Sequence, residues 1–285
     1  MVRLSCGRTR ARTIGETVAS KDWGGIDIRA DIPHAGRMYD YMLGGTTNFE
    51  SDRVASHAAG LEFPGGIEAA KAGLRANRDF LGRAVRFMAE EAGIRQFLDL
   101  GTGIPSEDNT HAIALSVAPE SKVVYVDNDP IVLAHAHELL STTPTTNTSY
   151  LYADIRDTAS ILAQASETLD FDRPIGLVVV AIMHFISDAE DAHGLVARLV
   201  DAVPSGSYLA VSHLASDMVP GLVELYAGIS EKTQETFILR DREEFTRFFD
   251  GLELVDPGVT LVASWRGQPP ESGPDIFYAG VGRKP

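Results

Sequence analysis

The stretch Gln96-Phe-Leu-Asp-Leu-Gly-Thr-Gly-Ile-Pro-Ser106 decides the fold of this chain. Residues 97–100 predict a short buried strand, and the turn Gly101-Thr102-Gly103 follows at once. Two glycines one residue apart permit positive φ angles and let a ligand approach the bare backbone. Asp99 lies near the end of the strand, where a doubly wound α/β sheet presents its ligand-binding edge. The stretch therefore predicts a strand followed by a ligand-binding turn.

A second apolar strand, Val123-Val-Tyr-Val-Asp127, also ends in a carboxylate. Asp127 lies 26 residues after Gly101 (127 − 101), which leaves room for a connecting helix. A strand, a glycine turn, a helix and a second strand that ends in an acid together predict a nucleoside-binding half-fold.

The dinucleotide fingerprint G-x-G-x-x-G requires a third glycine, and this chain has Ser106 at that position. S-adenosylmethionine (SAM) has no phosphate, only an amino-acid end, a sulfonium and a nucleoside. The turn therefore favours SAM over a dinucleotide. A purely structural tight turn and an NAD-dependent oxidoreductase are alternatives that the turn alone leaves open.

Composition places further bounds on function. The 285 residues allow one large domain, or one domain with an appendage. A formal net charge of −15 argues against a nucleic-acid binder, which would carry a basic face. The single cysteine, Cys6, allows no internal disulfide, and no apolar run approaches the ~20 residues of a membrane span. Residues 1–12 lack the apolar core of a signal peptide, so we expect a cytoplasmic protein without membrane contact.

The N-terminal third predicts two segments before the core. Residues 1–30 are polar and aperiodic and predict a flexible tail, and residues 31–92 predict a helical cap. Pro33 is suited to open a helix that Gly44-Gly45 ends. Its Met and aromatic residues suit a lid over a sulfonium and an adenine, but they also suit a helical pair that only covers the sheet. For the lid, we expect Arg37 and Asp52-Arg53 to form ion pairs with the body of the protein.

Residues 93–285 predict the core. Strands are expected at 97–100, 122–127, 150–154, 175–183, 208–212, 260–264 and 277–281. Helices are expected at 67–92, from Asp108 or Asn109 to 117, and at 130–140, 158–168, 189–202, 219–231 and 242–249. This alternation predicts a Rossmann-like, seven-stranded, mostly parallel sheet with helices on both faces.

The motifs Asp99-Leu-Gly-Thr-Gly103, Asp127 and Asp154 resemble, in this order, the class I SAM-dependent methyltransferases. The chain is most similar to one branch, the mainly actinobacterial S-adenosyl methyltransferase family, formerly a domain of unknown function. The residues that carry this resemblance are Pro33–Gly45, Asn48-Phe49, Asp52-Arg53, Asn77–Phe80, Phe97–Pro105, Asn109–His111 and Tyr125–Pro130. The resemblance spans about residue 30 to the C-terminus. It implies the class I methyltransferase fold, with SAM as cofactor and S-adenosylhomocysteine (SAH) as product, but no particular acceptor.

The resemblance also implies roles for single residues. Asp127 would accept hydrogen bonds from the ribose hydroxyls, and Asp154 would face the adenine amino group. Ile155 would pack on the adenine ring, Asp99 would lie near the amino group of SAM, and the glycine turn would lie against the methionine moiety. The full expected cofactor set is Arg78, Asp99, Gly101, Thr102, Gly103, Asp127, Asn128, Asp154, Ile155 and Met183, with Arg78 reaching the methionine carboxylate.

Methyl transfer from a sulfonium is an in-line displacement that needs alignment and desolvation, and it needs a base only if the acceptor must lose a proton. His184 follows the fourth predicted strand and is the candidate base, with a pocket wall or a structural histidine as the alternative. His34, His111 and His213 are weaker candidates. The chain has no spacing typical of a metal site and no G-x-S-x-G hydrolase motif. We expect a methyltransferase with an unidentified, small-molecule acceptor; the alternative is a SAM- or SAH-binding regulatory or inactive protein.

Overall fold

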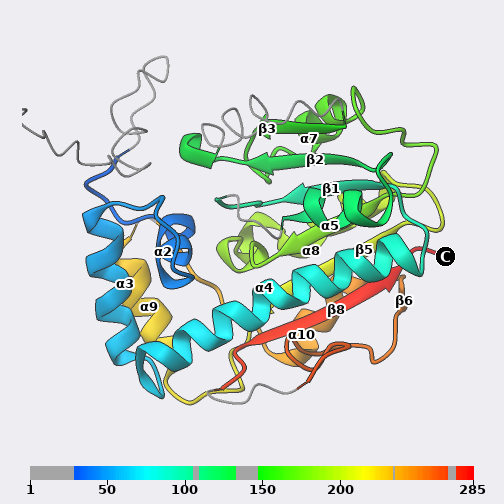
Figure 1. The fold of residues 1–285 in the computed structure, drawn as a ribbon. Coiled ribbons are helices and arrows are strands. Elements are labelled where there is room, and N and C mark those ends of the chain that lie inside the picture. The colour runs from blue at the N-terminus through cyan, green and yellow to red at the C-terminus, as the bar shows by residue number, and fades with distance from the viewer. Residues whose placement is uncertain (1–28, 105–108, 133–146, 234, 269–273) are drawn as a thin grey trace, which may run out of the picture.

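The computed structural model describes residues 29–104, 109–132, 147–233, 235–268 and 274–285 (Figure 1). Some predicted features lie outside this range: the tail up to residue 28, the residues Ser106 and Asp108, and the part of the helix at 130–140 that follows Val132. No helix among the described residues is long and apolar enough to cross a membrane.

A single sheet in the order β3-β2-β1-β4-β5-β8-β6 forms the centre of the structure, and β7 pairs with β8. Strands β1 to β5 are parallel, and β8 runs antiparallel to β5. The strands are β1 Gln96–Leu100, β2 Lys122–Asp127, β3 Thr148–Tyr152, β4 Gly176–Val180, β5 Tyr208–Leu214, β6 Glu253–Leu254, β7 Thr260–Leu261 and β8 Phe277–Arg283. The predicted mostly parallel α/β sheet is confirmed.

The described residues form eight strands of this sheet where seven were predicted, because the edge strand beside β8 is divided. Both β6 and β7 pair with β8, and the segment between them contains Pro257, which has no N–H to donate to a ladder. The predicted strand at 175–183 was too long. It ends at Val180 because Ala181 adopts a left-handed conformation with φ 55°, and a 3-10 helix at Met183–Phe185 follows.

Helices cover both faces of the sheet (Figure 1). The first core cluster joins alternate strand residues such as Phe97 and Val123 to the long helix α4, Gly66–Glu90, and to α5, Thr110–Val117. The second joins Leu98 and Val124 to α7, Thr158–Ala165, and α8, Ala192–Asp201. Every residue of β1 and β4 is buried, as expected for central parallel strands covered on both faces.

Three helices lie beyond the end of the sheet: α2 (Ala35–Met42), α3 (Glu50–Glu62) and α9 (Leu222–Lys232) (Figure 1). Asp40 holds the turn after α2, since its Oδ2 accepts hydrogen bonds from the backbone N–H of Thr47 and from Nδ2 of Asn48. A Cβ at Gly45 would lie 2.0 Å from Oδ1 of Asp40, so a side chain there would displace the Asp40 carboxylate from these bonds. The residues that make this segment distinctive in sequence therefore build its own turn.

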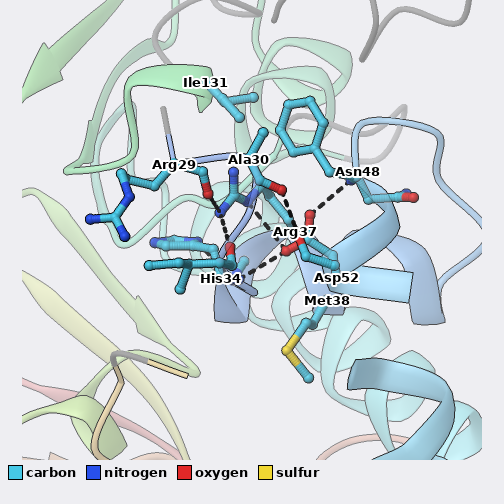
Figure 2. A network of polar contacts seen from close by, with 12 residues as sticks. Arg29, Ala30, His34, Arg37, Met38, Asn48, Asp52 and Ile131 are labelled. Carbon is cyan, nitrogen blue, oxygen red and sulfur yellow. Dashed lines mark hydrogen bonds and ion pairs between the residues drawn. The ribbon is translucent and has the colours of Figure 1, made fainter. Parts of the chain in front are cut away.

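Among the described residues, the ion pairs of Arg37, Asp52 and Arg53 lie within this segment and not between it and the body, as had been expected. Nε of Arg37 lies 3.4 Å from Oδ1 of Asp52, which also accepts the backbone N–H of His34, so this buried pair joins the start of α2 to α3 (Figure 2). Arg53 pairs with Glu50, one turn before it. Both partners of each pair belong to this segment, so the pairs stabilise the segment internally.

Candidate functional site

A cavity of about 960 Å³ opens at the C-terminal edge of the parallel strands. Its lining includes the turn that follows β1, the end of β2 and the turn that follows β4. Strands β2 and β3 lie on one side of β1 while β4 and β5 lie on the other, so the strand order reverses at this point. Open α/β sheets bind their ligands at such a switch point.

The glycine turn forms the floor of the cavity. Gly101 and Gly103 have φ angles of 69° and 65°, as their spacing predicted. A Cβ at Gly101 would lie 2.6 Å from Cδ1 of Ile182, whereas one at Gly103 would meet no atom of the described chain within 4 Å. Gly101 therefore gives room to the turn after β4, while Gly103 leaves open space on the cavity side. Thr102, between them, also lines the cavity.

Asp127 fixes this turn from the neighbouring strand. Its Oδ2 accepts the N–H of Gly103 at 2.8 Å, and its Oδ1 accepts the N–H of Asp129 at 2.9 Å. Each carboxylate oxygen accepts up to about two hydrogen bonds, so both keep capacity for a ligand hydroxyl. Burial raises the pKa of Asp127, and these two N–H donors oppose that shift. Asn128, the next residue, lines the cavity.

Asp99 is a buried carboxylate under the same turn. It is 4% exposed, lines the cavity, and accepts a hydrogen bond of 2.6 Å from Oγ1 of Thr110. Burial raises the pKa of Asp99 to about 6, although the Thr110 hydroxyl lowers it. The ionised form is therefore costly in the free protein, and a cationic ligand group would stabilise it.

We predict that Asp99→Asn stabilises the free protein near neutral pH. The folded pKa of about 6 exceeds the ordinary 3.8, so the stability contributed by the bound proton is complete below pH 3.8 and lost as pH rises through 6. At pH 7.5 the free energy of unfolding should rise by about 2–3 kcal/mol, at about 1.4 kcal/mol per pKa unit. Denaturant unfolding at several pH values measures this, with exposed Asp172→Asn as control. A gain of equal size at pH 4 and pH 7.5 would contradict the linkage.

Four further predicted residues take different places. Ile155 and Asp154 line the cavity beyond β3, and Asp154 accepts hydrogen bonds from the backbone and the side chain of Arg156. Arg78 lines the cavity from α4 and donates to Oδ1 of Asn109. Met183, by contrast, is completely buried in the second core cluster and does not line the cavity. Its place in the 3-10 helix follows from the early end of β4, which the sequence did not reveal.

His184 lines the cavity and is 4% exposed. Its ring stacks on Phe237 with centroids 5.7 Å apart and planes 13° apart, and its Nδ1 has no hydrogen-bond partner within the described chain. Burial, followed by nearby His213 and Arg240, lowers its pKa well below the usual range. The ring is therefore neutral at pH 7 and binds a proton weakly.

The other candidate histidines serve different contacts. His213 is completely buried and makes a 2.7 Å contact through Nε2 with Nη1 of Arg240. Nδ1 of His111 lies 2.8 Å from the Tyr125 hydroxyl. His34 lines the cavity, with Nδ1 3.3 Å from Asp129 and Nε2 3.4 Å from Glu235. The described residues contain no cluster of three or more His, Cys, Asp or Glu side chains that could hold a metal ion.

Much of the remaining lining is apolar, and most of this apolar part was not predicted. We call it the apolar wall, and it consists of Met38, Met42, Phe63, Leu74, Leu225, Tyr226, Ile229, Phe237, Ile276 and Phe277. These residues come from α2, α3, α4, α9, the segment before α10 (Arg242–Thr246) and the start of β8. Phe237 packs against Tyr226 and Phe185 at centroid distances of 5.0 and 4.8 Å. Of this wall, only Met38 and Met42 belong to the predicted segment whose Met and aromatic residues suit a lid.

The profile of a family described as S-adenosyl methyltransferase matches residues 21–285. The chain belongs to this family. It is therefore a SAM-dependent methyltransferase by family and fold, and SAM is its cofactor. Among proteins of curated description, none matches the chain.

Solved structures agree with the family membership. A DUF574 family protein from Streptomyces avermitilis is 44% identical over 91% of this chain and 100% of its own, with a TM-score of 0.85. A provisionally assigned methyltransferase from Thermobifida fusca is 39% identical over 93% and 99% of the two chains, with a TM-score of 0.82. An O-methyltransferase family protein from Burkholderia thailandensis, 12% identical over 95% and 70% of the chains, shares the fold with a TM-score of 0.52.

The residues around the glycine turn fit this cofactor. Gly103 leaves open space where a side chain would project, and Asp127 presents a carboxylate beside it. Asp99 supplies a buried carboxylate that a cationic amino group would stabilise, and Arg78 supplies a cation for a carboxylate. The site thus offers one complementary group to each charged end of an amino-acid moiety.

Proposed function

We propose that this chain transfers the methyl group of SAM to a small, largely apolar molecule held against the apolar wall. The observation that carries the proposal is one cavity, about 960 Å³ in volume, lined both by the glycine turn with its carboxylates and by the apolar wall. Ligand pockets typically span about 300–1,000 Å³ and combine apolar lining with a few placed polar groups. A cavity at the upper end of this range suits a cofactor and an acceptor together.

We assign the cofactor contacts as follows. Asp127 accepts the ribose hydroxyls beside Asn128, Asp154 and Ile155 face the adenine, and the turn Gly101–Gly103 lies against the methionine moiety. Asp99 receives the amino group, and Arg78 receives the carboxylate. Bound SAM supplies an electrophilic methyl group, and the chain's own residues orient it and exclude water.

In this proposal, His184 contacts the acceptor together with the apolar wall. Its neutral, weakly basic ring stacks on Phe237 and offers a flat aromatic surface to the acceptor. The chain carries a net charge of −15, so we infer that nucleic acid is not the acceptor. With a single cysteine in 285 residues, a cytoplasmic location stays our prediction.

A thermal-shift panel with SAM, SAH, NAD and NADP tests the proposal. We expect SAM and SAH to raise the melting temperature and both dinucleotides to leave it unchanged, because a ligand at 100 times its Kd stabilises by about 2.7 kcal/mol. Stabilisation by NAD or NADP alone would contradict the cofactor assignment. Stabilisation by SAH without SAH formation across a panel of small aromatic acceptors would favour a binding protein over an enzyme.

We further propose that the segment from Pro33 to Arg53 covers the bound cofactor. It supplies His34, Met38 and Tyr39 to the cavity lining, and His34 lies between Asp129 and Glu235 of the body. A cover that excludes water strengthens every electrostatic contact inside it.

Hydrogen exchange with and without SAH tests this cover. We expect slower exchange across 35–53 when SAH is bound, and unchanged exchange in the distant α8. Unchanged exchange across 35–53, with SAH binding shown independently, would mean that the segment only packs on the body.

A further inference from the structure

A buried chain of hydrogen bonds links the N-terminal helix α2 to the turn after β4. The Tyr39 hydroxyl donates to the carbonyl of Leu74 at 3.0 Å and accepts from Nδ2 of Asn77 at 3.1 Å. Oδ1 of Asn77 accepts the hydroxyl of Ser212 at 2.6 Å. Oγ of Ser212 accepts the N–H of Ala181 at 3.0 Å. Each group in this chain has a defined donor or acceptor role, so the direction of every bond is fixed.

This series of hydrogen bonds ends at the backbone of Ala181, which is strained. Ala181 has a φ of 55°, a conformation that residues with a Cβ rarely adopt. Such residues persist when the surrounding structure holds them, and they concentrate at functional sites. Here the N–H of Ala181 bonds both to the Ser212 hydroxyl and to the Ser212 carbonyl, the latter at 3.2 Å. Ser212 and Asn77 are 0% and 1% exposed, so water does not replace these bonds.

The strained turn presses against the glycine turn. Ile182 follows Ala181, and its Cδ1, Cγ1 and Cβ lie within 2.6–2.8 Å of the position that a Cβ on Gly101 would take. Ala181, Ile182 and Gly101 all line the cavity. A shift of the turn at Ala181 would therefore displace the surface on which the cofactor lies.

We infer that Tyr39, Asn77 and Ser212 are positioning residues that hold the turn Ala181-Ile182 against Gly101 and so couple the packing of α2 to cofactor affinity. This inference rests on the proposed cofactor site at the glycine turn. It gives the N-terminal segment a second role besides covering the ligand. Through these three side chains, none of which belongs to the glycine turn, the α2 helix influences the position of the turn against which the cofactor lies.

Two single variants test the coupling from opposite ends. Tyr39→Phe removes the hydroxyl on α2, and Ser212→Ala removes the hydroxyl under the turn. Ser212 is buried and does not line the cavity, so its effect on a ligand must pass through its hydrogen-bond partners Ala181 and Asn77, both of which line the cavity. Calorimetry should show SAH affinity reduced about three- to tenfold in each, the range expected for loss of one buried hydrogen bond. Tyr41→Phe is the matched control, because the Tyr41 hydroxyl has no hydrogen bond within the described chain and Tyr41 does not line the cavity.

The decisive variant is Ala181→Gly, because glycine adopts positive φ without strain. In that background, Ser212→Ala should change SAH affinity by less than about twofold, since the turn no longer needs the hydroxyl to hold its conformation. A purely structural role for Ser212 would give the same loss in both backgrounds. If Ser212→Ala does not fold, Tyr39→Phe against Tyr41→Phe in the two backgrounds gives the same comparison.

Amide exchange without ligand separates this inference from the proposed function. The amides of Ala181 and Ile182 should exchange about three- to tenfold faster in Tyr39→Phe than in Tyr41→Phe. If the wild type fails to bind SAH, the proposed function is wrong. The exchange comparison of Tyr39→Phe with Tyr41→Phe still tests whether the hydrogen bonds hold the turn at Ala181. If the wild type binds SAH and Tyr39→Phe matches Tyr41→Phe in affinity and exchange, the inference is wrong and the proposed function stands.

Discussion

Asp127→Ala is expected to weaken SAH binding by at least about 100-fold, because it removes two charge-assisted hydrogen bonds of about 1.5–3 kcal/mol each. The structure adds a second cost. Asp127 also accepts the N–H groups of Gly103 and Asp129, so its removal loosens the glycine turn itself. Calorimetric titration with SAH measures the affinity, and thermal unfolding measures the loosening.

Two further variants separate these effects. Asp127→Asn keeps one carbonyl acceptor, so it should retain more stability than the alanine variant while still losing most of the affinity. Asp172→Ala removes an exposed carboxylate just before β4, at the opposite edge of the sheet, and should change neither property. Unchanged SAH affinity in Asp127→Ala would remove Asp127 from the cofactor site.

Valine at either glycine of the turn is expected to abolish SAH binding, but with different costs in stability. Gly101→Val combines positive φ with a collision against Ile182 and should cost about 2–5 kcal/mol. Gly103→Val meets no atom of the described chain and adds mainly backbone strain, so we expect about 1–3 kcal/mol. Thermal unfolding and SAH titration of both variants give the comparison.

The two valine variants also control for each other. Gly103→Val should remain folded at 25 °C, so its loss of binding cannot be ascribed to global unfolding. Normal SAH binding by a folded Gly103→Val would show that this turn does not hold the cofactor.

Local sequence patterns predicted most of the fold. The run Phe97–Gly103 combines a buried strand with a turn whose two glycines have positive φ, and both features depend only on neighbouring residues. The expected helix at 67–92 appears as α4, Gly66–Glu90, because its apolar residues recur at helical period. Boundaries failed where tertiary contacts decide them. The strand β4 stops early because Ser212 holds Ala181 in a left-handed conformation.

The acidic half of the site could be predicted, and the apolar half could not. Asp99 and Asp127 end successive parallel strands, so one rule about sheet edges brings them together. Tyr226 and Phe237 reach the cavity from a helix and a segment whose positions depend on packing against α3 and Phe185. Asn77 and Ser212 bond across 135 residues, and no periodicity in the sequence marks such a pair.

We propose that SAM binds at the glycine turn with its ribose on Asp127, in a cavity that it shares with the acceptor. A crystal structure of the wild-type protein with SAH tests this most directly. We expect SAH to lie against Gly101–Gly103, with its ribose hydroxyls on the Asp127 carboxylate and its sulfur toward the apolar wall. SAH bound elsewhere, or bound in this cavity with its ribose away from Asp127, would show that this site is wrong.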